Sequence, residues 1–220
     1  MAETWTVRPI EPSDTDRIVM RCWPEDAAAR RRLFARQHTI GMAAWDGDVC
    51  VGQLHCYAVD FPAVENVDWP MWNRWWPDVV GFRAPRAGRA WCHACFHVGR
   101  TLAKAKVDDD PDETYFGRGI GSALCRASMT WAHDAGYVAV VAPAAPPGLP
   151  SFAAWAGGMP WTTYARLGFT QVGTLGAPDE LPAWARGDSP PHVMDEARGE
   201  LVAGRDPENF VARLMMLDMR

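Results

Sequence analysis

Residues 115–124 read Tyr-Phe-Gly-Arg-Gly-Ile-Gly-Ser-Ala-Leu and begin the most regular helical pattern in the chain. The apolar residues that follow recur at helical spacing: Ile120, Leu124, Ala127 and Trp131. With Gly136 as a stop signal, this pattern predicts a helix over 120–135. Glycines let backbone N–H groups approach a ligand closely, and a helix N-terminus favours an anion. Because Arg118 adds a cation, the stretch predicts a phosphate or pyrophosphate site.

Two other phosphate-binding motifs do not fit these glycines. A dinucleotide-binding turn needs a third Gly or Ala where Ser122 and Leu124 stand. It also needs an acidic residue near the end of the next strand, where Ala142 and Pro143 stand. A Walker-type loop needs Gly-Lys-Ser/Thr after the glycines, and this sequence has none there. Both classes of nucleotide site are therefore excluded.

Strand and helix patterns alternate on both sides of this turn. The expected strands are 5–10, 40–45, 49–59, 90–98, 137–142, 169–172 and 211–217. The expected helices are 25–37, 120–135, a segment that Ser13 or Asp14 caps and that reaches Trp23, and a short helix ending at Leu167. The pair Asp46-Gly47 predicts a tight hairpin turn. Alternation without a break in composition favours one α/β or α+β domain.

The turn Gly117–Leu124 resembles the signature of the GNAT N-acetyltransferase family, which binds the pyrophosphate of acetyl-CoA at this helix start. Phe116 departs from the pattern, because the family usually has Gln or Arg there. A second segment, Tyr164–Phe169, resembles the family's Tyr-x-x-x-Gly-Phe, whose Tyr protonates the departing CoA thiolate. The resemblance implies these acetyl-CoA-binding residues: Phe96, Val98, Phe116, Gly117, Arg118, Gly119, Ile120, Gly121 and Ser122.

The resemblance also implies a fold and a catalytic strand. We expect a single domain over 1–220, with a mixed sheet of about six to seven strands flanked by helices, and insertions at about 61–88, 100–114, 143–160 and 176–205. The strand before the turn would polarise the thioester carbonyl through its backbone near Phe96–Val98. A side chain on this strand would serve as general base, with His93 first and His97 second, while packed histidines are the alternative. The third catalytic residue is Tyr164.

The same strand holds Cys92 and Cys95, at the spacing of a metal-binding knuckle. In a regular strand these two residues point to opposite faces, which argues against such a site. His93, Cys95 and His97 would share one face, so a three-ligand site stays open, as does a bulge that changes the faces. We expect no metal.

The acceptor is expected to be a small-molecule amine that reacts directly in a ternary complex. The residues expected to line its site are Trp72, Trp76, Trp161 and Cys95. An extra hydrophobic core or a homodimer interface is the alternative reading of the twelve tryptophans. A non-catalytic acyl-CoA-binding or sensor module, or a GNAT fold with non-acetyl chemistry, remains the alternative function.

Composition limits the other partners. The 22 Lys and Arg against 27 Asp and Glu give a net charge of −5, which argues against nucleic-acid binding. No apolar run is long enough to span a membrane, and no secretory signal is visible. Six cysteines in such a chain predict reduced thiols, so we expect a cytoplasmic protein without nucleic-acid or membrane partners.

Overall fold

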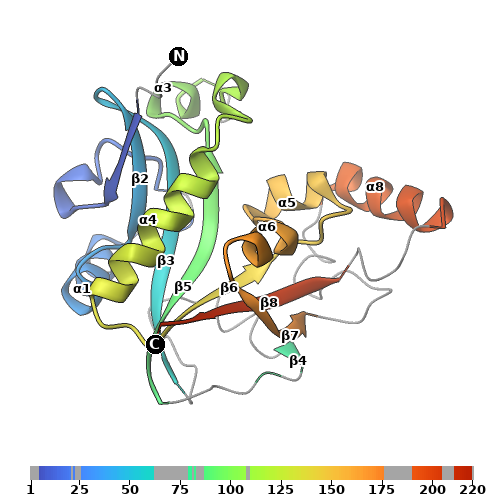
Figure 1. The fold of residues 1–220 in the computed structure, drawn as a ribbon. Coiled ribbons are helices and arrows are strands. Elements are labelled where there is room, and N and C mark those ends of the chain that lie inside the picture. Colours follow the sequence, from blue (N-terminus) through green and yellow to red (C-terminus); the bar gives the residue numbers. More distant parts are fainter. Residues whose placement is uncertain are drawn as a thin grey trace.

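A computed structural model describes residues 5–20, 22, 26–61, 79–80, 82, 87–107, 110–175, 190–204 and 211–219. Its centre is a mixed sheet in the order β1-β2-β3-β5-β6-β8-β7-β4 (Figure 1). The strands are β1 Trp5–Pro9, β2 Gly41–Asp46, β3 Val49–Phe61, β4 Val79–Val80, β5 Gly88–Val98, β6 Ala139–Ala144, β7 Thr170–Leu175 and β8 Ala212–Asp218. The pair β5–β6 is parallel and the other pairs are antiparallel. The expected mixed sheet is confirmed, with the two-residue β4 added at one edge.

Helices cover the sheet on two faces. They are α1 Ala27–Gln37, α3 Leu102–Ala105, α4 Ile120–Asp134, α5 Pro150–Ala156, α6 Trp161–Arg166 and α8 Pro191–Val202, with 3-10 turns η1 Pro12–Asp14 and η3 Glu113–Tyr115. Alternate residues of β2 belong to different cores: Ala43 packs in the cluster with Leu33 of α1, and Ala44 in the cluster with Leu124 of α4. Because strand side chains alternate, α1 and α4 lie on opposite faces (Figure 1).

Strands β5 and β6 separate after a short parallel contact. They pair at Ala90, Trp91 and Cys92. Beyond Cys92, β5 stays paired with β3 as far as Val98, and β6 stays paired with β8 as far as Ala144. Figure 1 shows the two strands diverging between α4 and the part that carries α5 and α6. The sheet therefore opens in its middle.

A bulge in β5 decides which face its side chains occupy. His55 of β3 pairs with Cys95, and the next residue, Cys56, pairs with His93, so Ala94 is the extra residue. Before the bulge, Cys92 belongs to the cluster on the α1 face, and after it Cys95 does too. The expectation that Cys92 and Cys95 face opposite ways is therefore wrong. The expected shared face of His93, Cys95 and His97 is wrong for the same reason.

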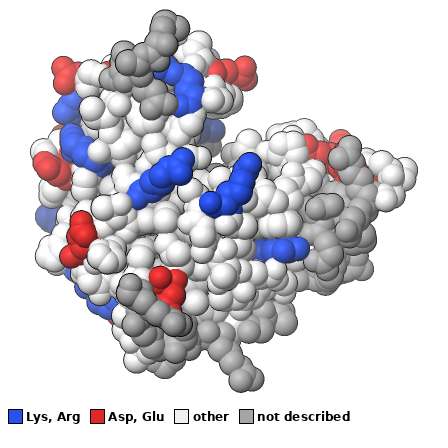
Figure 2. Space-filling view, viewed as in Figure 1, with Lys and Arg blue, Asp and Glu red and all other residues white. Residues whose placement is uncertain are grey.

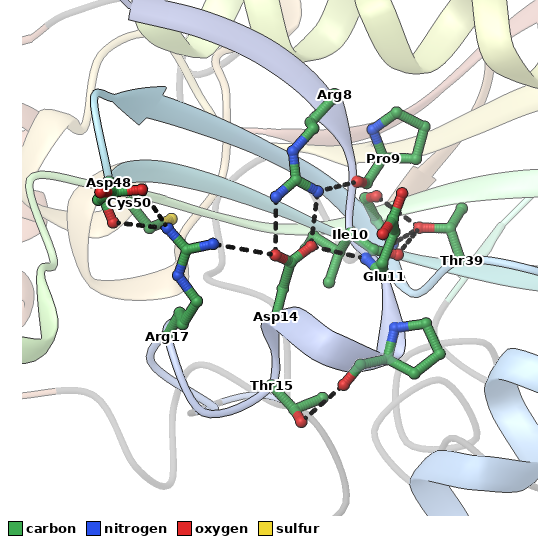
Figure 3. Close-up of polar contacts among 12 residues, drawn as sticks. Arg8, Pro9, Ile10, Glu11, Asp14, Thr15, Arg17, Thr39, Asp48 and Cys50 are labelled. Carbon is green, nitrogen blue, oxygen red and sulfur yellow. Dashed lines mark hydrogen bonds and ion pairs between the residues drawn. The ribbon is translucent and has the colours of Figure 1, made fainter.

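The helix expected to follow β1 does not form in the described residues. Pro12–Asp14 is a 3-10 turn, and the Asp14 carboxylate accepts two hydrogen bonds from Arg8, at 2.6 and 2.7 Å, and one from the Glu11 N–H (Figure 3). With its amide group turned so that the nitrogen faces Val19 O and the oxygen faces Val19 N, the Gln53 side chain makes two hydrogen bonds to the Val19 backbone, at 3.0 and 3.1 Å. The spacing of apolar residues predicted a helix here. Instead, the Asp14 carboxylate that would cap it is bonded to Arg8 of β1, and the Val19 backbone groups that would bond within it face Gln53 of β3.

The other expected elements lie within a few residues of their predicted positions, and the Asp46-Gly47 turn joins β2 to β3 with Gly47 at a φ of +57°. The segment 143–160 also contains α5, and 176–205 contains α8, neither of which the sequence pattern predicted. Trp72 and Trp76 lie outside the described residues. None of the described helices is both long and apolar enough to cross a membrane.

Candidate active site

The N-terminus of α4 is open to an anion. Gly119 is its N-cap residue, with a φ of +80°, and no side chain caps this helix end. A Cβ atom added at Gly117, Gly119 or Gly121 would meet no heavy atom within 4 Å. The space around these three glycines is open. The first-turn N–H groups of a helix have no partner within it, and the helix dipole adds a partial positive charge at this end. The residues fit the pyrophosphate cradle predicted for them.

Packing fixes the position of this cradle on the sheet. Ile120 is 1% exposed and lies against β3, where a Cβ at Gly52 would come within 2.5 Å of the Ile120 side chain. Arg118 lies over the Tyr115 ring at 5.3 Å, and Phe116 is 48% exposed. Figure 2 shows Lys and Arg side chains across the middle of the face that α4 covers, beside an indentation toward the α5 side. This face suits a polyanionic ligand.

Backbone groups of β5 point into the opening between β5 and β6. The Phe96 N–H donates to Gly157 O at 2.7 Å, away from β3, whereas the Gly99 N–H donates to Val51 O in β3 at 2.8 Å. In an antiparallel pair, successive N–H groups alternate between the two sides. The Val98 N–H therefore points to the same side as that of Phe96. The Phe96 N–H is already bonded to Gly157 O. Of the two N–H groups predicted to face a thioester carbonyl, that of Val98 is therefore the better placed.

Tyr164 of α6 reaches the same opening from the α4 face. It is 1% exposed, and its ring packs on Phe169 with centroids 4.9 Å apart. Its hydroxyl lies 3.5 Å from Nδ1 of His93. Burial raises the pKa of the Tyr164 hydroxyl well above its usual 10, so this group keeps its proton at neutral pH. The structure thus brings together two of the predicted catalytic residues, Tyr164 and His93.

His93 is enclosed by polar and aromatic neighbours. Its Nε2 lies 3.0 Å from Ser128 Oγ, which also accepts a hydrogen bond from Trp91 Nε1 at 2.9 Å. Because the Ser128 oxygen accepts from Trp91, its own hydroxyl is able to donate to His93 Nε2. His93 then carries its ring proton on Nδ1, the nitrogen that faces Tyr164. Burial lowers the pKa of His93 to about 3, so the ring is neutral near pH 7. A general base working near pH 7 is best served by a higher pKa.

Ser128 was not among the predicted site residues, although the sequence carries a signal for it. Ile120 and Leu124 mark the inward stripe of α4, and Ser128 continues it four residues later as a polar side chain that is 0% exposed. A hydroxyl at an apolar stripe position usually has a buried polar partner to satisfy.

The remaining predicted residues are divided between the two faces of the sheet. Cys95 and His97 are on the α1 face, where both contact Cys22, so the bulge separates them from Tyr164. Trp161 begins α6, and the Arg213 guanidinium lies over its ring at 3.8 Å. Nothing in the sequence pointed to Cys22 as a site residue, because Cys22 and its contact Cys95 on β5 are more than 70 residues apart along the chain.

Neither protein-family models nor curated proteins match this sequence. Solved structures do. Arylalkylamine N-acetyltransferase 2 from Aedes aegypti is 13% identical, with 99% of this chain and 100% of that chain covered and a TM-score of 0.53. A putative arylalkylamine N-acetyltransferase 7 from the same mosquito is 14% identical, with 98% and 88% covered and a TM-score of 0.53. The GNAT-like decarboxylase GphF with isobutyryl-CoA is 15% identical, with 98% and 100% covered and a TM-score of 0.51. The chain therefore has the GNAT fold, as its motifs predicted.

Proposed function

We propose that this protein is an acyl-CoA-dependent N-acetyltransferase that acts on a small-molecule amine by direct transfer. One observation carries the proposal: Ile120 at the uncapped N-terminus of α4 and the buried Tyr164 belong to one core cluster, and Phe96 and Val98 of β5 pack against that cluster. A phosphate cradle, a row of backbone donors and an acid are what thioester aminolysis requires. In this proposal the 220 residues form a single cytoplasmic domain.

The donor would lie along main-chain groups. The first-turn N–H groups of α4 and the Arg118 guanidinium hold the pyrophosphate. The Val98 N–H donates to the thioester carbonyl and stabilises the charge that develops on its oxygen. Acetyl-CoA, when bound, supplies the activated acetyl group.

Side chains on the α4 face would handle the departing thiolate. Tyr164 donates its hydroxyl proton to that sulfur. Ser128 holds the His93 ring at Nε2, and the Nδ1–H of that ring orients the Tyr164 oxygen. Both His93 nitrogens have partners inside the protein, so we propose that solvent, rather than His93, takes the proton of the amine. His97, on the other face with Cys22, is not placed for this step.

The acceptor proposal has separate support. The two mosquito structures are named as arylalkylamine N-acetyltransferases, and this chain carries twelve tryptophans, whose faces suit a cationic amine or an aromatic ring. We propose that Trp161, Trp72 and Trp76 contact this acceptor, with a homodimer interface as the alternative role of the last two.

Thiol release from acetyl-CoA tests the proposal. The panel contains arylalkylamines, aliphatic amines and a peptide with a free N-terminus, and the enzymes are the wild type, Tyr164→Phe and Tyr137→Phe. We expect turnover on a small amine, a loss of about 10²-fold or more in Tyr164→Phe, and little change in Tyr137→Phe, a second buried tyrosine whose ring packs on Trp91 and Trp131.

Other outcomes of this assay contradict the proposal in distinct ways. CoA binding without turnover on any amine would indicate a sensor module. Turnover on the peptide alone would exclude a small-molecule acceptor. Unchanged turnover in Tyr164→Phe would remove this residue from the mechanism. In a separate assay with a carboxyacyl-CoA, release of carbon dioxide would indicate decarboxylation instead.

A further inference from the structure

A cluster of sulfur and nitrogen atoms lies on the α1 face, apart from the proposed catalytic residues. Cys22 Sγ is 3.5 Å from Cys95 Sγ and 3.2 Å from His97 Nε2, and Cys95 Sγ is 3.2 Å from the same Nε2. All three potential ligand atoms thus lie within 4.8 Å of one another. Cys95 is 8% exposed and His97 9%, while Cys22 is half-buried, so water reaches the cluster only from the Cys22 side.

These distances match the edges of a tetrahedral zinc site. With Zn–S about 2.3 Å and Zn–N about 2.0–2.1 Å, a tetrahedron separates two sulfur atoms by roughly 3.8 Å and sulfur from nitrogen by roughly 3.6 Å. The observed separations of 3.5 and 3.2 Å are shorter by about 0.3–0.4 Å, which small side-chain rotations can supply. One nitrogen, Nε2, faces both sulfurs, as a shared metal would require.

The chemistry of the cluster also suits a divalent cation. A thiolate is the form that binds a metal. Two thiolates and a neutral imidazole around Zn²⁺ carry no net charge, which lowers the cost of burying the ion.

The surrounding structure holds the three residues in place. Cys95 and His97 are two residues apart on β5, and Cys95 abuts Gly157, where a Cβ would come within 2.2 Å of its sulfur. The Tyr57 hydroxyl donates to the Cys22 carbonyl at 2.9 Å. His55 supplies an outer contact, since its ring centroid lies 4.6 Å from that of His97.

We propose that Cys22, Cys95 and His97 form a zinc site with three protein ligands, which ties the segment after β1 to β5, with a water molecule in the fourth position. Soft thiolate and imidazole ligands in a compact tetrahedral arrangement favour Zn²⁺ over harder cations. This proposal departs from the expectation of no metal. It does not depend on the proposed acetyl transfer, because the three ligands are not used there.

The test is zinc stoichiometry and affinity of the full chain under reducing conditions. The metal-free protein is titrated with Zn²⁺ against a chromophoric chelator, and bound zinc is counted by mass spectrometry after dialysis. We expect one zinc per chain in the wild type and in Cys50→Ser, whose buried sulfur lies outside the cluster. Cys22→Ser should lose more affinity than the roughly 10–100-fold that outer-shell changes cost.

Cobalt provides a second readout that does not depend on activity. Co²⁺ in the wild type should show thiolate-to-metal charge transfer, which Cys22→Ser should weaken and His97→Asn should alter, and circular dichroism checks that the variants are folded. Equal zinc affinity in the wild type and Cys22→Ser would overturn the proposal. Cobalt binding without thiolate charge transfer in the wild type would also overturn it.

Discussion

At the residue scale, the Ser128 hydroxyl connects the residues of the candidate site to the core. The Ser128 hydroxyl lies within hydrogen-bond reach of Trp91, His93 and Cys56, at 2.9, 3.0 and 3.6 Å. It is fully buried, so water cannot replace it for any of these partners. The position of His93, and through it that of the Tyr164 hydroxyl, therefore rests on one oxygen of α4.

Removing that oxygen should destabilise the protein strongly. Ser128→Ala leaves Trp91 Nε1 and His93 Nε2 buried without their shared partner, so we expect the free energy of unfolding to fall by about 2–4 kcal/mol. Ser13→Ala, at an exposed position of η1, is the control and should change it by less than about 0.5 kcal/mol. Urea denaturation measures both, and equal values for the two variants would contradict this account.

A buried thiol should make stability depend on alkaline pH. Burial raises the pKa of Cys50 from 9.0 to about 12 in the folded chain. Between these values the unfolded chain has already lost its proton while the folded chain still holds it. The contribution of Cys50 is therefore fully present below pH 9 and is lost as the pH rises toward 12.

The effect can be isolated with one variant. From pH 8 to pH 10 under reducing conditions, the unfolding free energy of the wild type should fall more than that of Cys50→Ala. The difference should approach about 1.4 kcal/mol for each pH unit above 9. Parallel pH profiles for the two proteins would show that Cys50 ionises equally in both states.

At the scale of elements, α4 is the part that the sequence predicts best. Its apolar stripe and its glycines are local signals, and the structure places its start at Ile120 as expected. The same glycines differ in backbone conformation, since Gly119 has a φ of +80° and Gly121 does not have a positive φ. The two positions should therefore respond to alanine in opposite ways.

Gly119→Ala forces a Cβ into the left-handed region, so the unfolding free energy should fall by about 1–2 kcal/mol. Gly121→Ala should raise it by about 0.5–1 kcal/mol, because its Cβ meets open space and alanine is the better helix former. Thermal and urea denaturation of the two variants measure this. A loss of stability at both positions would mean that packing, not backbone conformation, governs the turn.

Elements that depend on distant contacts could not be predicted. The helix expected over 13–23 fails because Asp14 pairs with Arg8 and because Val19 bonds to Gln53 of β3. The bulge at Ala94 exists only in relation to β3, so sequence parity placed Cys95 and His97 on the wrong face. The start of α4 and the short helix that carries Tyr164, in contrast, were predicted by local patterns.

At the scale of the whole molecule, two halves of the sheet meet over a short contact. On one side are β1, β2, β3 and β5, and on the other β6, β8, β7 and β4, joined at Ala90–Cys92 of β5. Farther along β5, the hydrogen bond from Phe96 N–H to Gly157 O crosses the gap. A ligand that fills the opening would contact both halves.

Binding of CoA should therefore stabilise the whole chain and protect particular amides. At a CoA concentration 100 times its Kd, the free energy of unfolding should rise by about 2.7 kcal/mol. Hydrogen exchange should slow at Val98 in the opening, while Cys56 N–H, already bonded to Ile40 O within the sheet, serves as the control. Stabilisation without protection at Val98 would place the ligand elsewhere.

The opening between β5 and β6 also means that this sheet has strand edges in its interior as well as at its rims. Unpaired edges usually invite aggregation, but here they face each other across a gap that Gly157 narrows. A flexible molecule with amide groups can form hydrogen bonds with these unpaired strand edges, as an added β-strand would. Recognition of such a ligand relies on main-chain N–H and C=O groups, which nearly every residue type supplies. A site of this kind tolerates extensive side-chain replacement.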